Sequence, residues 1–275
     1  MSAKTEEFFN ELKIAVESDK LILPTLPEVA LKIRESVENK NTSAQQIAET
    51  LSQDASLSAR LIQVSNSPLY RSRAPIEDLQ MAVTRMGIRM VKDLVISLAM
   101  KQIFQATSDI LDEQFRNCWN TAVDVAAISR MLATTVPGIN PEQALLAGLI
   151  HNIGSLPILV KAEDDNLFND SDALKNVIKE LTAPVSVLIL ETWHFGDAMT
   201  EVVKHANNFS YSHEGGAGLI DLVQAAILQG GYGPDDLDWS SVPAFEKLGM
   251  DSDVNIVEIE ENKEQIENTK QSLLV

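Results

Sequence analysis

Apolar residues recur with the 3.6-residue spacing of an α-helix along almost the whole of this 275-residue chain. Prolines, glycines and capping residues, such as Asp54 and the alternatives Thr42 and Ser43, divide the pattern into segments of helix length. Strict apolar–polar alternation is nearly absent, and its one short instance, residues 254–259, lies in charged surroundings. The chain is therefore predicted to be all-α, with amphipathic helices packed on one another.

These prolines, glycines and capping residues also predict where the helices lie. Short helices are expected around residues 8–16, 26–33, 47–51, 57–64 and 76–86, and longer ones over 88–104, 112–134, 141–151, 171–181, 184–194, 197–206 and 217–229. Gly154 and Pro157 are expected to break the chain before a polar loop. The helical pattern is interrupted near residues 105–112, which predicts a two-part helical bundle. Its parts are an N-terminal part (1–105), a second bundle (106–235) and an acidic, partly extended C-terminal segment (236–275).

Five segments match a known signature in order. The chain resembles the HDOD domain, a non-catalytic offshoot of the HD phosphohydrolases found in bacterial signalling proteins, through residues 23–30, 47–61, 65–70, 76–87 and 144–154. The resemblance covers about residues 20–230 and implies an HD-like second bundle and a signalling role. The same segments also have a purely structural interpretation as helix entrances, caps and turns.

The apolar helix before Gly154 ends on the pair His151-Asn152. In the HD phosphohydrolases an adjacent His and Asp help to hold a divalent ion that activates water. The resemblance implies four ligand positions, which fall on Thr121, His151, Asn152 and Ile227. A neutral carboxamide does not supply the anionic oxygen that a hard cation prefers, and no histidine precedes residue 151. We therefore expect no catalytic residue, no metal site and no cofactor.

His205, near the end of a predicted helix, has two interpretations. It could pair with His151 around an ion or an anion, or it could be a favourable cation at a helix C-terminus. His194 and His213 are expected on the surface or in loops, and Cys118 is expected to be a buried structural thiol.

The net charge of −18 argues against broad binding to nucleic acid or to anionic membranes. The chain opens without a secretory pattern, and no apolar run of transmembrane length is visible, so we expect a cytoplasmic protein. Residues 251–275 hold seven acids against two lysines, and we expect this segment to be separable from the fold.

Residues 60–101 form the one basic region. Its candidate partner-binding residues are Arg71, Arg73, Arg85, Arg89 and Lys92. If the helical turn around residue 87 is continuous, the last three lie at i, i+4 and i+7 on one side and could meet an acidic partner or the protein's own tail. The alternative is that these residues are ordinary solvated helix faces.

The sequence as a whole predicts a non-catalytic signal-transduction or protein-interaction module of HDOD type, whose partner is another signalling protein. Two alternatives stay open. One is a divergent metal-dependent phosphohydrolase, and the other is a nucleotide or second-messenger sensor that uses the remaining HD cavity.

Overall fold

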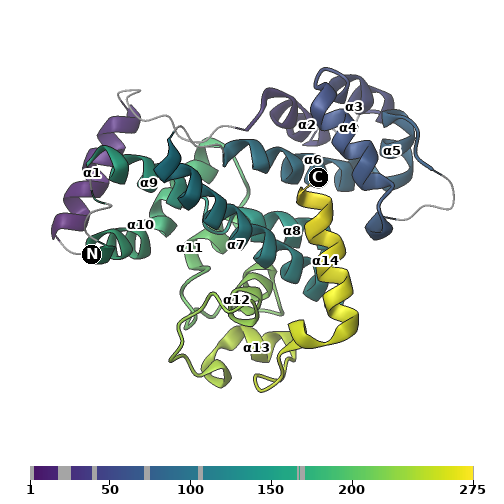
Figure 1. Cartoon of the computed structure of the whole chain (residues 1–275). Helices are drawn as coiled ribbons and strands as arrows, with labels where there is room; N and C mark the ends of the chain where they lie inside the picture. Colours follow the sequence, from purple (N-terminus) through teal and green to yellow (C-terminus); the bar gives the residue numbers. More distant parts are fainter. Residues whose placement is uncertain are drawn as a thin grey trace.

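The computed structural model describes residues 3–17, 26–38, 42–70, 75–104, 108–165, 167 and 171–274. Within these ranges every regular element is a helix, which confirms the all-α prediction (Figure 1). The helices are α1 (Ala3–Glu17), α2 (Glu28–Glu38), α3 (Ala44–Leu51), α4 (Ala55–Ser65), α5 (Leu79–Met86), α6 (Ile88–Ile103), α7 (Asp109–Ala133), α8 (Pro141–Ile150), α9 (Ser155–Asp164), α10 (Ser171–Thr192), α11 (Asp197–His205), α12 (Leu219–Gln229), α13 (Pro243–Leu248) and α14 (Glu260–Leu274). Short 3₁₀ turns are η1 (Pro68–Tyr70), η3 (Trp239–Ser241) and η4 (Ile256–Glu258).

Side-chain caps set several helix starts, as the sequence predicted. Of the two candidates for α3, Ser43 is the cap, and it forms a reciprocal capping box with Gln46. The Asp54 carboxylate accepts a 3.0 Å hydrogen bond from the Leu57 N–H at the start of α4.

Two predicted boundaries are wrong because proline was given too much weight. The helix α9 forms where a break was expected, since Pro157 occupies its first turn, where a backbone N–H has no partner within the helix. The segment predicted as two helices is the single helix α10, with Pro184 inside it. Its buried face runs on past the proline through positions 177, 181, 185 and 189, so packing maintains the helix there.

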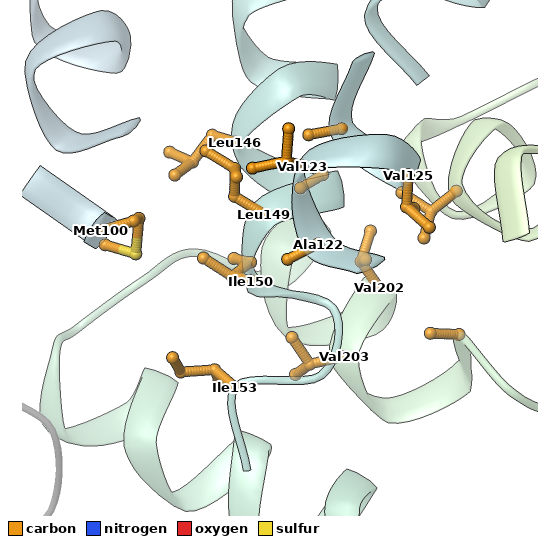
Figure 2. Close-up of a cluster of buried hydrophobic side chains, with 14 of the residues drawn as sticks. Met100, Ala122, Val123, Val125, Leu146, Leu149, Ile150, Ile153, Val202 and Val203 are labelled. Carbon is orange, nitrogen blue, oxygen red and sulfur yellow. The ribbon is translucent and has the colours of Figure 1, made fainter. Parts of the chain in front are cut away.

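The centre of the molecule is the pair formed by α7 and α8. A Cβ atom placed on Gly148 would lie 2.4 Å from the Ala126 Cα, so the two backbones touch at this crossing. The turn after α8 is equally close to α10, because a Cβ on Gly154 would lie 2.3 Å from the Thr182 carbonyl oxygen. Figure 2 shows the aliphatic side chains that fill the surrounding core, from α6, α7, α8 and α11.

The buried side chains form two main clusters. The smaller one comes from α2 to α6, and the larger one includes side chains of α1, α7 to α12 and α14. The helix α6 serves both, since Val95 faces the smaller cluster and Met100 the larger. Phe8 and Leu12 join α1 to the larger cluster, away from α2–α5 (Figure 1). The boundaries at residues 105 and 235 stay a prediction.

A buried polar cluster joins the N-terminal helices to the α7–α8 pair. The Tyr70 hydroxyl in η1 donates a 2.5 Å hydrogen bond to the Glu142 carboxylate at the start of α8. The same carboxylate accepts from Arg130 of α7 at 3.0 Å, and the guanidinium lies over the Tyr70 ring. Burial, followed by the negative charge of Glu142, raises the pKa of Tyr70 well above its usual value, so the phenol stays a donor.

The stretch Pro141–Asp164 is, by length and composition alone, the one candidate membrane span among the described residues, so the expectation of none was wrong. The most apolar part of this stretch is 83% buried inside the fold, as a core segment is.

The acidic C-terminal segment is docked on the fold, so the expectation that it is separable was wrong. Its helix α14 packs along α7 and buries Ile266 and Leu273 in the larger cluster (Figure 1). The Lys270 Nζ lies 2.6 Å from the Asp124 Oδ1. At the end of α14, Arg60 and Lys101 donate to the carbonyls of residues 273 and 274, a favourable place for cations.

The buried face of α14 explains why the sequence wrongly predicted a separable segment. The four acids of α14 lie on its exposed side, whereas its buried positions, 266, 269, 272 and 273, recur at helical spacing on the other side. Ile256 and Val257 also pack against the core, while Ile259 is exposed.

Two adjacent leucines test the docking of α14. Leu273 is 1% exposed and Leu274 is 50% exposed. Leu273→Ala is expected to lower the free energy of unfolding by roughly 2–5 kcal/mol, because it leaves a cavity in the core, whereas Leu274→Ala changes it little. Urea denaturation of both variants makes the comparison. Equal effects would show that α14 is not held through its buried face.

Candidate functional site

His151 ends α8 as a neutral, buried imidazole. Its Nδ1 lies 2.6 Å from the Gly148 carbonyl oxygen, so Nδ1 carries the proton and Nε2 is left as an acceptor. Burial lowers the pKa of His151 to about 4, although the hydrogen bond to Gly148 acts in the opposite direction. The side chain is 4% exposed and is therefore uncharged near neutral pH.

A cavity of about 640 Å³ lies in front of His151. Its walls come from α7, the end of α8, the first half of α10, the chain after α11 and the end of α12. Four predicted positions, Thr121, His151, Asn152 and Ile227, line this cavity together. The other described lining residues are Cys118, Ser155, Lys175, Ile178, Lys179, Thr182, Asn207, Phe209, Tyr232, Gly233 and Pro234. We call this space the HD cavity.

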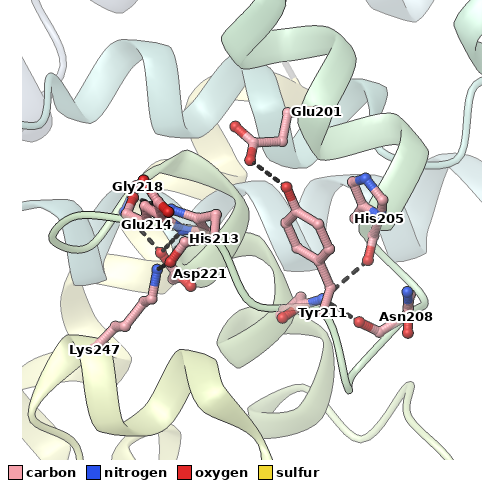
Figure 3. Close-up of polar contacts among 10 residues, drawn as sticks. Glu201, His205, Asn208, Tyr211, His213, Glu214, Gly218, Asp221 and Lys247 are labelled. Atoms are coloured by element: carbon pink, nitrogen blue, oxygen red, sulfur yellow. Dashed lines mark hydrogen bonds and ion pairs between the residues drawn. The ribbon is translucent and has the colours of Figure 1, made fainter.

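His205 does not belong to the described lining of the HD cavity. Its ring stacks on Tyr211, with the two ring centroids 3.6 Å apart, and the Tyr211 hydroxyl donates to Glu201 (Figure 3). Burial and the neighbouring Lys204 lower the pKa of His205. The stacked ring disfavours a ligand shared with His151, and the lowered pKa also disfavours the alternative of a cation at the helix C-terminus.

The residues of the HD cavity do not fit a divalent metal ion. Nowhere in the described ranges do three or more His, Cys, Asp or Glu side chains cluster closely enough to hold one. The described lining of the cavity contains no carboxylate, and the buried Oδ1 of Asn152 is a neutral oxygen without a partner. Hard cations of this kind need carboxylate oxygens, and a lone imidazole does not replace them.

The thiol of Cys118 is also unsuited to nucleophilic attack. Its Sγ lies 3.5 Å from the Ser155 Oγ, and burial raises the thiol pKa despite this contact. The thiol is therefore protonated at neutral pH, but it is half-buried in the cavity wall and not buried as predicted.

Lys175, Lys179 and Tyr232 are among the lining residues that the sequence analysis missed. Lys175 and Lys179, one turn apart on α10, bring positive charge to the HD cavity. The Tyr232 hydroxyl donates to the Asp124 carboxylate, which also pairs with Lys270 of α14. Burial, then the bond to Asp124, raises the pKa of Tyr232. No motif marks these positions, because they meet the cavity only through the packing of α7, α10 and the chain after α12.

The predicted basic surface is only partly present. Gly87 adopts φ +86° between α5 and α6, so the turn is not a continuous helix and the i, i+4, i+7 argument fails. Arg85 and Arg89 are exposed, but the Lys92 Nζ lies 3.1 Å from the Asp93 Oδ1 in a second cavity. The positions Arg71 and Arg73 lie outside the described residues.

His213 lies in the loop before α12, as expected, and holds that loop in place. Its Nε2 is 2.8 Å from the Asp221 Oδ2, which also accepts from the Gly218 N–H (Figure 3). Burial alone would lower the pKa of His213, but its bonds to Asp221 and to the Glu214 carbonyl raise it overall. Lys247 of α13 donates to the His213 carbonyl, so this cluster fixes the loop structurally.

The HDOD domain family model matches residues 23–209. The chain belongs to this family. A crystal structure from Shewanella amazonensis SB2B, provisionally described as a metal-dependent phosphohydrolase, is 30% identical with a TM-score of 0.84, over 99% of this chain and 100% of that one. An HDOD domain protein of unknown function from Geobacter sulfurreducens is 19% identical with a TM-score of 0.70, over 96% and 98% of the two chains.

Two further matches cover unequal shares of the two chains compared. A structure from Marinobacter aquaeolei VT8, provisionally described as a signal transduction protein, has 19% identity and a TM-score of 0.64, over 98% of this chain and 66% of that one. An uncharacterized protein of Treponema pallidum (strain Nichols) is 24% identical over 220 residues, or 74% of this chain. The match spans 41% of the length of that relative.

The depressed pKa of His151 predicts a loss of stability in acid. Between the unfolded value near 6.5 and the folded value of about 4, the unfolded chain binds the extra proton. The free energy of unfolding should therefore fall by roughly 3 kcal/mol as the pH drops from 6.5 to 4. Chemical denaturation across this range should show a shallower acid dependence in His151→Gln. An NMR titration that protonates the folded imidazole near pH 6.5 would contradict this account.

Proposed function

We propose that this HDOD protein is a non-catalytic signal-transduction and protein-interaction module whose HD cavity has lost its metal centre. The observation that carries the proposal is the common location of Thr121, Asn152 and Ile227 beside His151 in one cavity. The cavity lies at the end of the apolar helix α8, and the side chains at these three positions offer a hydroxyl, a carboxamide and an alkyl group. These groups do not activate water through a metal.

The lining also lacks a metal-free route to hydrolysis. His151 is the one imidazole in the described lining, and no carboxylate orients it, because its Nδ1 is bonded to a backbone carbonyl. The Cys118 thiol is protonated, and Ser155 donates its hydroxyl proton to the Asn152 carbonyl. An activated nucleophile needs an adjacent base, and this pairing is missing from the described lining.

A hydrolysis screen tests the loss of catalysis. Purified protein should show no turnover of phosphomonoesters, cyclic dinucleotides or nucleoside triphosphates above background with added Mg²⁺, Mn²⁺, Fe²⁺ or Ni²⁺. Metal analysis after purification without chelators should find no stoichiometric ion. Turnover that disappears in His151→Ala would show that the cavity is an active site and would overturn the proposal.

One observation favours a second candidate function, a sensor of nucleotides or second messengers in the HD cavity. The described lining has two lysines and no acid in a protein of net charge −18, which suits an anionic ligand. A thermal-shift screen against the same phosphates separates the candidates, since saturation at 100 times the dissociation constant stabilises by about 2.7 kcal/mol. Stabilisation that is lost in Lys175→Ala and Lys179→Ala supports the sensor.

For the interaction role we propose a cytoplasmic signalling partner with an acidic surface, rather than nucleic acid or membrane. The exposed guanidinium groups of Arg85 and Arg89 flank the turn between α5 and α6. Charges of this kind steer encounter more than they add affinity, and salt screens them.

Charge reversal tests this surface. The double change Arg85→Glu and Arg89→Glu should reduce the amount of partner protein recovered in a pulldown at low salt by a few-fold. It should leave the melting temperature nearly unchanged. Arg116→Glu is the matched control, because Arg116 is an exposed arginine on α7 whose one described ion pair is with Asp112 on the same helix. Equal capture by the double variant and the control would exclude this surface.

A further inference from the structure

A second cavity, of about 290 Å³, lies between the N-terminal helices α2 and α6 and the helices α8, α11 and α12. Helices α2 and α6 line it on one side, and α8, the corner between α10 and α11 and the start of α12 line it on the other. The described lining shares no residue with that of the HD cavity. Its residues are Arg34, Lys92, Asp93, Ile96, Gln143, Leu146, His194, Phe195, Gly196, Asp197, Ala198, Met199 and Leu219. We call it the seam cavity.

The N-terminus of α11 forms one wall of the seam cavity and has no side-chain cap. Gly196 is the cap residue, and its carbonyl accepts from the N–H groups of Met199 and Thr200. In the described part of the chain, the N–H groups of Asp197 and Ala198 have no hydrogen-bond partner. Such groups bind anions, because they carry the positive end of the helix dipole.

Arg34 supplies a buried positive charge at the same place. Its side chain is 8% exposed, and its guanidinium donates to the Trp193 carbonyl at the end of α10. The guanidinium also lies over the Phe195 ring, at 5.8 Å from the centroid. Its Nε is buried without a hydrogen-bond partner. A buried guanidinium with an unused donor needs an acceptor, and the described protein groups do not supply one.

Asp93 supplies the opposite charge. It is 2% exposed, and its Oδ1 pairs with Lys92 while its buried Oδ2 has no partner. An unpaired buried carboxylate oxygen is costly, so a donor from a bound molecule would stabilise it. The seam cavity therefore has an unsatisfied donor and an unsatisfied acceptor, both on side chains more than nine-tenths buried.

The charges and the apolar walls define the ligand. Arg34 and Lys92 balance Asp93 and Asp197, which favours a zwitterion over an anion or a cation. Ile96, Leu146 and Met199 offer aliphatic contacts, and the volume suits a small metabolite. His194 adopts φ +53° at this corner, a backbone conformation that non-glycine residues rarely adopt and that is concentrated at ligand sites.

We propose that the seam cavity binds an α-amino acid with an aliphatic side chain. Its carboxylate is held by Arg34 and the N-terminus of α11, its ammonium group by Asp93, and its side chain by the aliphatic wall. Such a ligand contacts α2 and α6 on one side and α8, α11 and α12 on the other, and so stabilises the relative position of these helices. This site goes beyond the interaction role proposed above and does not depend on it.

Ligand analogues test the need for both charged groups. L-Valine, L-leucine and L-methionine at millimolar concentration are the probes for thermal shift and calorimetry, with isocaproate (no amino group) and isopentylamine (no carboxylate) as controls. At least one amino acid should raise the melting temperature and bind with a stoichiometry near one, and neither control should. No effect from any of the three amino acids, or equal binding of isocaproate, would overturn the proposal.

A glycine substitution tests the place of binding without removing a buried charge. Gly196 has an extended conformation with open space at its Cβ, so Gly196→Asp adds a capping carboxylate that competes for the N–H groups of α11. This variant should melt at or above the wild-type temperature and bind the amino acid about tenfold more weakly or worse. Gly216→Asp is the matched control, because Gly216 is also open but lies in a loop outside the cavity. Unchanged binding in Gly196→Asp would place the ligand elsewhere and reject the site.

Discussion

The backbone contact between α7 and α8 is the constraint on which the rest of the structure depends. Because Gly148 has no side chain, α8 lies directly on Ala126, and helices α6, α9, α12 and α14 pack around this pair. The short distance places His151 beside Thr121, and the second close approach, at Gly154, brings α10 across the same end. The HD cavity is the space that these two backbone contacts leave open. Its shape is therefore kept when the side chains that line it are replaced.

Local signals were enough to predict most of the helices and the centre of the HD cavity. Caps such as Ser43 and Asp54 act within one turn, and the ligand positions followed from the resemblance. The wrong predictions concern segments whose structure is determined by contacts with residues far away in the sequence. The buried face of α10 continues through Pro184, and the docked side of α14 is hidden in an acidic composition. Lys175 reaches the cavity through tertiary packing alone, which a single sequence does not reveal.

The basic region of the N-terminal helices is divided among several structural tasks. Arg60 and Lys101 hold the carbonyls at the end of α14, and Lys92 pairs with Asp93 in the seam cavity. The motif at residues 65–70 likewise ends in Tyr70, which binds Glu142 and so joins the N-terminal helices to α8. Many of the basic residues that the sequence suggests to be surface charges therefore hold the N-terminal helices, α8 and the C-terminal helix together.

Three helices, α8, α10 and α12, run between the two cavities, and α12 lines the seam cavity with Leu219 and the HD cavity with Ile227. Leu146 of α8 lines the seam cavity and His151 at its end lines the HD cavity, while α10 lines the HD cavity and ends at the corner beside Arg34. The backbone contacts at Gly148 and Gly154 leave no room for α8 or α10 to slide at these points. A sliding motion of α8 or α10 therefore does not couple the two cavities, and any coupling acts through an element that has two arrangements.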